Sequence, residues 1–150
     1  MMVLNNTAIA TIIATIFSTL VTIIISIIVN KRDKLQNLDN QLDSILKIAV
    51  EYPYLESPAF TKTWKENCKN STEAYRRYEA YATLVFNYLS RVSAFFKYDM
   101  KKINGYIDIK GWVKIHQTYW FSPSESNENE QVYDEKFKKI IHTILGELPR

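Results

Sequence analysis

His116 is the residue best suited to carry chemistry. On a helix it would share a face with Trp112 and Tyr119, so its imidazole is expected to be at least half buried. A histidine in such a place can act as a catalytic base, bind a ligand, or serve as a hydrogen-bonded core residue. The core interpretation is favoured, because no Ser, Cys or acidic residue stands at a spacing on the same helix that would give it a partner.

A second set of candidates combines basic side chains with aromatic neighbours. Arg76 and Arg77 lie at helical spacings from Glu79 and Glu73 that favour ion pairs, so a solvated, paired surface is the plainer interpretation. If an oligomer frees them, Arg side chains and aromatic rings suit the phosphate and the base of a nucleotide. We therefore predict a ligand site, for a nucleotide messenger among other ligands, at Arg76, Arg77, Lys114, His116 and Trp120.

The usual enzymatic motifs are missing from the sequence. No His-Glu-x-x-His, Cys-x-x-Cys or Gly-x-Ser-x-Gly pattern occurs, and the 3 Gly form no phosphate loop. The 2 His cannot complete a zinc site without carboxylates around them, and the single Cys68 cannot form an intrachain disulfide, which fits a reducing compartment. We expect no enzyme, no cofactor and no metal; a small membrane-bound hydrolase that depends on His116 is the enzymatic alternative.

The first thirty residues carry no charged side chain, whereas all 19 Lys and Arg and all 16 Asp and Glu come later. The 22 residues from Ala8 to Val29 are apolar or hydroxyl-bearing, and as a helix they reach roughly 33 Å, enough to cross the bilayer hydrocarbon. The segment before them lacks Lys and Arg and no small-residue cleavage site follows, so an uncleaved anchor is favoured over a signal peptide. Because Lys31, Arg32 and Lys34 follow the span, we expect a single-pass inner-membrane protein with its N-terminus outside and residues 31–150 in the cytoplasm.

Hydroxyl side chains gather on one side of this span. Inside a stripe about 100° wide, facing away from the Ile-rich sides, lie Thr11, Thr15, Ser18, Thr22 and Ser26, with Thr7 before them. Hydroxyl residues at spacings of three and four let transmembrane helices approach closely and hydrogen-bond. We predict that this hydroxyl stripe joins copies of the chain or, in an assembly of four or more, lines a mildly polar pore. The alternative is that each hydroxyl bonds to its own backbone four residues earlier.

The remaining residues predict a compact all-α domain. Apolar positions repeating at three and four indicate about five helices, over residues 33–51, around 58–64, 72–98, 111–121 and 133–145. The polar composition of residues 122–130 predicts a solvated loop. We therefore expect two domains, a short N-terminus with a transmembrane helix at 1–30 and a cytosolic helical domain at 31–150. The apolar stripe of 33–51 points away from the hydroxyl stripe, so either the chain bends near Asn30 to Asp33 or the two stripes serve different contacts.

The layout of a span with a hydroxyl stripe, from Thr11 to Ser26, and a compact cytosolic helical domain resembles the small membrane effectors of bacterial antiphage defence, including type III CRISPR accessory effectors. In those proteins a cytosolic domain oligomerises or senses a nucleotide signal, and the spans perturb the membrane. The resemblance rests on architecture without a shared motif, and it implies the same roles for the stripe and the basic patches here.

These features together lead us to expect a membrane-anchored, homo-oligomeric signalling or effector protein. Its expected partners are the lipid bilayer, its own copies, and a nucleotide second messenger or a cytosolic protein. Duplex nucleic acid is not expected, because acidic and basic residues are interleaved and the formal net charge is only +3. The alternative function is a passive anchor or scaffold that recruits a cytosolic partner to the inner membrane.

Overall fold

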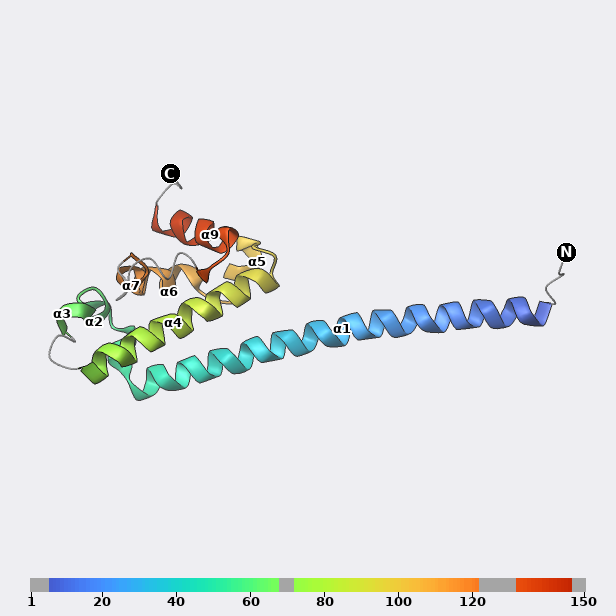
Figure 1. Ribbon diagram of the computed structural model, residues 1–150, viewed down its shortest axis with the longest axis horizontal. Coiled ribbons are helices and arrows are strands. Elements are labelled where there is room, and N and C mark those ends of the chain that lie inside the picture. The colour runs from blue at the N-terminus through green and yellow to red at the C-terminus, as the bar shows by residue number, and fades with distance from the viewer. Residues whose placement is uncertain (1–5, 68–71, 122–131, 147–150) are drawn as a thin grey trace. The chain divides into compact units, whose positions relative to one another are not determined.

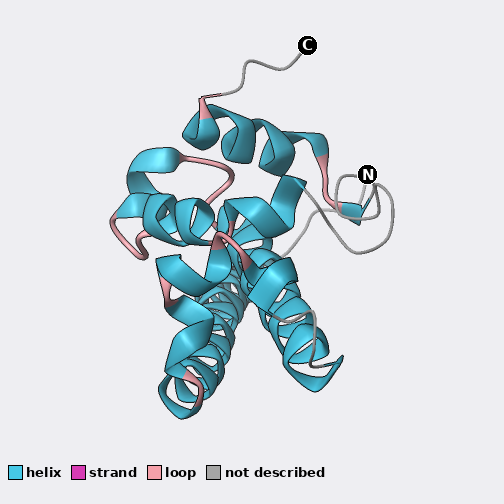
Figure 2. Cartoon of the chain, turned by 90° about the vertical axis from the view of Figure 1, so that its left-hand side faces the viewer, coloured by secondary structure: helices cyan, strands magenta, loops and turns pink. Residues whose placement is uncertain are grey.

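The computed structural model describes residues 6–67, 72–121 and 132–146, and within these ranges it is helical without a strand. Figure 2 shows these helices in cyan, joined by short loops. The chain divides into two compact units, Met1–Asp39 and Asn40–Arg150. The all-α fold class is confirmed: one long apolar N-terminal helix is followed by several helices that form a compact domain. The predictions for Cys68 and for the loop at 122–130 lie outside the described residues.

The long N-terminal helix, α1 (Asn6–Glu51), has no break near Asn30 to Asp33, where a bend was one of two expectations. Side chains from Ile9 to Val29 are exposed. Among the described residues, α1 is the one helix that is long and apolar enough to cross a membrane. A set of exposed Ile, Val, Leu and Phe side chains on one helix is what a lipid environment would cover, so α1 supports membrane association.

The second unit is built around one central helix. The last residues of α1, from 40 to 51, belong to this unit and are followed by η1 (Pro53–Glu56), α2 (Pro58–Thr61), α3 (Trp64–Asn67), α4 (Thr72–Phe95), α5 (Met100–Asn104), α6 (Ile109–Ile115), α7 (Gln117–Phe121) and α9 (Glu135–Leu145). Figure 1 shows α4 running beneath α5, α6, α7 and α9. The fully or almost fully buried side chains of α4 include Tyr78, Tyr81, Ala82, Val85, Phe86, Tyr88, Leu89 and Val92. They supply one wall of the core.

Two of the predicted helices are divided in the structure. The segment expected around 58–64 forms α2 and α3, which are one turn each. The helix expected at 111–121 begins two residues earlier, because the Asp108 carboxylate accepts a hydrogen bond from the Gly111 amide and so caps α6. It then breaks at His116, whose backbone (φ −99°, ψ 14°) lies outside the α region.

The C-terminal end of α4 is tightly tied to the start of α9. Lys97 and Tyr98 both have positive φ, 55° and 62°, and the Tyr98 amide donates to the Ser93 carbonyl at 2.7 Å. The Tyr98 hydroxyl donates to Asp134 at 2.9 Å, and the other oxygen of that carboxylate caps α9 by accepting from the Phe137 amide at 3.0 Å. The cap therefore fixes where α9 begins relative to the end of α4.

Candidate functional site

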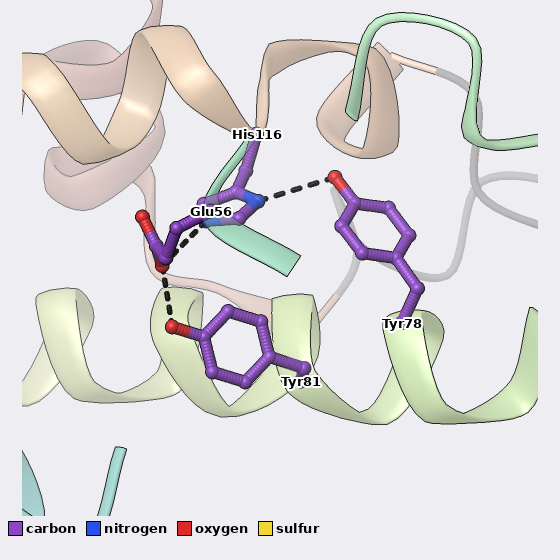
Figure 3. A network of polar contacts seen from close by, with 4 residues as sticks. All are labelled: Glu56, Tyr78, Tyr81 and His116. Carbon is purple, nitrogen blue, oxygen red and sulfur yellow. Dashed lines mark hydrogen bonds and ion pairs between the residues drawn. The ribbon is translucent and has the colours of Figure 1, made fainter. Parts of the chain in front are cut away.

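A buried histidine connects three segments of the second unit (Figure 3). His116, fully buried between α6 and α7, has its Nδ1 3.1 Å from the hydroxyl of Tyr78 on α4. Its Nε2 lies 3.3 Å from Oε1 of Glu56 in η1. Tyr81, also on α4, donates a hydrogen bond to the same carboxylate oxygen. We call these four residues the His116 network.

The charge state of the network follows from its hydrogen bonds. Burial raises the pKa of Glu56, but hydrogen bonds from His116 and Tyr81 and the attraction of His116 outweigh it, so that pKa lies below its ordinary value. Burial and the hydrogen bond to Glu56 raise the pKa of Tyr81 well above the ordinary range. Tyr81 therefore stays a donor and Glu56 an acceptor. With a proton on Nε2, His116 donates to Glu56, and the hydrogen bond between its Nδ1 and the Tyr78 hydroxyl gives each of the four groups a partner.

The surroundings of the network are aromatic. The Tyr78 ring lies 5.1 Å from that of Trp64 and 5.4 Å from that of Phe60, and the Tyr81 ring lies 5.8 Å from the imidazole. A His and Glu pair can activate a nucleophile, but the bonded partners here are two phenols and no Ser, Thr or Cys. The arrangement suits a structural connection of η1, α4 and the α6–α7 junction better than acid–base catalysis.

Glu56 is the partner that the sequence analysis missed. Helical spacing brings His116 together only with residues of its own helix, whereas Glu56 lies sixty positions earlier in a single turn of 3-10 helix. The only local signal was the break at Tyr52-Pro53-Tyr54, which indicates that the chain turns back there. Nothing in that pattern points to position 116.

The other predicted ligand residues do not line one described cavity with His116. Arg77 is ion-paired with Glu73, its guanidinium carbon lies 4.1 Å from the Tyr52 ring centre, and it donates to the Tyr54 hydroxyl at 3.3 Å. Arg76 is exposed. Lys114 is exposed and lines a cavity of about 370 Å³ with Lys62 and Gln117, whereas Trp120 is buried against Phe86, Tyr133 and Phe137. Arg77 is thus already engaged by an acid and two phenols.

The hydroxyl stripe shows the backbone bonding that was its alternative interpretation. In the stripe, the side chain of Thr15 donates to the Thr11 carbonyl and that of Thr22 to the Ser18 carbonyl, each at 2.9 Å; Thr19, just beyond the stripe, donates to the Thr15 carbonyl at the same distance. These bonds use the hydroxyl protons within one helix. Each oxygen keeps a lone pair that can accept a hydrogen bond from a neighbouring helix.

Comparison with known proteins gives no relative. No protein family, no curated protein and no solved structure matches this chain. Within the described ranges no group of three or more His, Cys, Asp and Glu side chains could hold a metal ion. The function has to be argued from the residues themselves.

Acidification should weaken the fold through Glu56. Because the folded pKa of Glu56 lies below its ordinary value of 4.5, its stabilisation is complete above that value and is lost as the pH falls through the folded pKa. The urea midpoint of the full chain in detergent, followed across this range, should fall more for the native protein than for Glu56→Gln. An equal fall in both would assign the acid sensitivity to other carboxylates.

Proposed function

We propose that the protein is a single-span membrane protein that associates with its own copies and acts as a signalling or effector protein. In this proposal the helical domain lies in the cytoplasm, binds a ligand or a protein there, and changes how the spans associate. A nucleotide messenger is one candidate ligand. The observation that carries the proposal is the uncharged, exposed segment of α1 from Ile9 to Val29, whose hydroxyls lie on one side.

Two further observations support a binding protein over an enzyme. His116, which has a carboxylate partner, is fully buried in an aromatic core, and both of its hydrogen-bonding positions are taken by protein groups. The described residues outside it offer exposed basic side chains, such as Arg76 and Lys114, which can recognise an anionic ligand without chemistry.

Replacing Thr11, Thr15, Ser18 and Thr22 together with Leu should abolish membrane leakage. The change removes four hydroxyls of the stripe that could accept a bond from a neighbouring helix and puts bulkier side chains in their place, so close approach of the spans is lost. Leakage of an ion-sensitive dye from vesicles carrying the full-length protein, with and without cyclic nucleotides, should fall to that of empty vesicles, and the protein extracted in mild detergent should become monomeric.

The matched control places four changes on the opposite side of the same helix. Ile13, Ile16, Ile24 and Ile27 replaced together with Leu keep the length and hydropathy of the span and leave the hydroxyls in place, so leakage should persist. Unchanged leakage in the Thr and Ser variant would contradict a functional stripe.

A passive anchor is the second candidate, favoured by the bonds of Thr15, Thr19 and Thr22 to their own helix. Hydroxyls satisfied in this way need no partner, and the span would then only hold the domain at the membrane. This function predicts a monomer in detergent and no leakage from any vesicle, with membrane localisation the same in both Leu variants.

A further inference from the structure

A groove with lysines along its edge lies where α4 ends. It has a volume of about 300 Å³ and is lined by Tyr98, Met100, Lys136, Lys139, Ile140 and Thr143. The Tyr98 ring, Met100 and Ile140 supply apolar surface, and two lysines of α9 supply positive charge. The α9 residues come from the helix that packs on α4 (Figure 1).

Positive charge dominates around this groove. Between residues 97–102 and 134–139 there are six lysines and three acids, which leaves a net charge of +3. Asp99 pairs with Lys102 at 3.3 Å and Glu135 pairs with Lys138, whereas Lys97, Lys101, Lys136 and Lys139 are exposed and have no ion pair to any described residue. Apolar surface edged by unpaired lysines fits an anionic amphiphile.

The groove is held in place by the chain around it. Tyr98 adopts a positive φ of 62°, a conformation that ordinary side chains seldom adopt. Its hydroxyl donates to Asp134, and the Lys136 ammonium lies 5.4 Å from the centre of its ring. These contacts fix the ring and one lysine before any ligand arrives, so little ordering is needed on binding.

Chain connectivity puts this groove at the end of the unit that the span enters. Within the unit, α4 runs antiparallel to residues 40–51, because Arg91 donates to Gln41 at 2.8 Å, while Leu84, earlier in α4, lies with Ile48, later in α1, on a second hollow between these two helices. The end of α4, and Tyr98 after it, therefore lie at the same end as Asn40. Lys31 lies nine positions before Asn40, so the two are at most roughly 30 Å apart even if the chain between them is fully extended.

We propose that this groove and its lysines bind the anionic headgroups of the membrane in which the span sits. The inference rests on the proposed insertion of α1. Juxtamembrane clusters of lysine are attracted to anionic lipid within about a Debye length of the surface, and the apolar floor accepts the upper part of an acyl chain or glycerol. The contact sets the distance of the domain from the bilayer.

The test measures that distance on the full-length protein. Cys68→Ser first removes the single native cysteine, so that only an introduced one is labelled. The exposed Asn104 of α5 is then changed to Cys and labelled with an environment-sensitive fluorophore, and the protein is reconstituted in vesicles. Quenching by spin-labelled lipid should be about twofold stronger in equal parts of phosphatidylcholine and phosphatidylglycerol than in phosphatidylcholine alone, and high salt should reverse the difference. Equal quenching in the two lipids overturns the proposal.

Matched variants assign the effect to the groove. Lys136→Gln with Lys139→Gln should remove the lipid dependence, whereas Lys62→Gln with Lys114→Gln, which removes the same charge elsewhere, should keep it. Loss of the lipid dependence in both pairs of variants would show a general charge effect. A change in fluorophore quenching caused by inorganic phosphate in neutral vesicles would show a site for free anions. Either result overturns the proposal. Flotation of the protein with neutral vesicles tests the insertion of α1 by itself, so failure of the proposed insertion can be distinguished from failure of the lipid contact.

Discussion

Replacing Phe137 with Ala should lower the free energy of unfolding of the helical unit by about 3–5 kcal/mol. Phe137 is fully buried, and its ring lies 5.3 Å from that of Tyr133 and 6.1 Å from that of Trp120. α9 has only 11 residues, and helices this short are marginal in water without packing. The change therefore removes most of what holds α9 on the core.

This prediction can be measured on the full chain in detergent. Urea unfolding followed by tryptophan fluorescence, to which the buried Trp120 contributes, gives the midpoint and slope. Val50→Ala is the control, because Val50 is 79% exposed and its truncation should change stability by less than about 0.5 kcal/mol. A Phe137→Ala midpoint as close to the native value as that of Val50→Ala would show that α9 contributes little.

The local pattern of apolar residues was sufficient to predict the positions of the longer helices. The apolar repeats of α4 and α9 extend over enough turns to define a face, and Gly146, with φ 76°, ends α9 where a left-handed residue is required. The prediction of a helix start failed where a glycine suggests one boundary and a side-chain cap sets another. Gly111 looks like a boundary in the sequence, yet the Asp108 carboxylate caps the helix first.

Individual burial was predicted less well than helix position. Leu84 and Leu46 belong to apolar stripes in the sequence, but they remain 45% and 44% exposed, because each stripe is wider than the surface packed against it. Periodicity gives the direction of a face and does not give the width of its partner. Which part of a broad stripe is covered depends on tertiary packing.

The His116 network shows why the site could be predicted only in part. Trp112 and Tyr119 on the same helical face indicated burial of His116, and full burial is observed. Its carboxylate partner depends on the turn after α1 bringing η1 against α4, a contact between distant segments that no spacing rule contains. For Arg77, the pairing with Glu73 followed from helical spacing, whereas its contacts with Tyr52 and Tyr54 are long-range and were missed.

Replacing His116 with Ala should destabilise the fold by about 3 kcal/mol, because it removes a fully buried side chain and breaks both of its hydrogen bonds, and each buried polar group left unsatisfied costs about 1–3 kcal/mol. Glu56 would lose the bond to Nε2, and the Tyr78 hydroxyl would face a cavity. If His116 were instead a catalytic residue with a minor structural role, the midpoint would hardly move. Unfolding midpoints by urea titration of the full chain decide between these roles.

A double-mutant cycle makes the same test specific to the pair. Glu56→Leu alone removes the carboxylate and leaves His116 with one partner, so it should also destabilise the fold. Combined with His116→Leu it replaces both polar groups by apolar ones of similar size, and the double variant should be more stable than the sum of the single effects predicts, by about 0.5–3 kcal/mol. Additive effects would mean that Glu56 and His116 contribute independently and that the 3.3 Å contact between them adds nothing to stability.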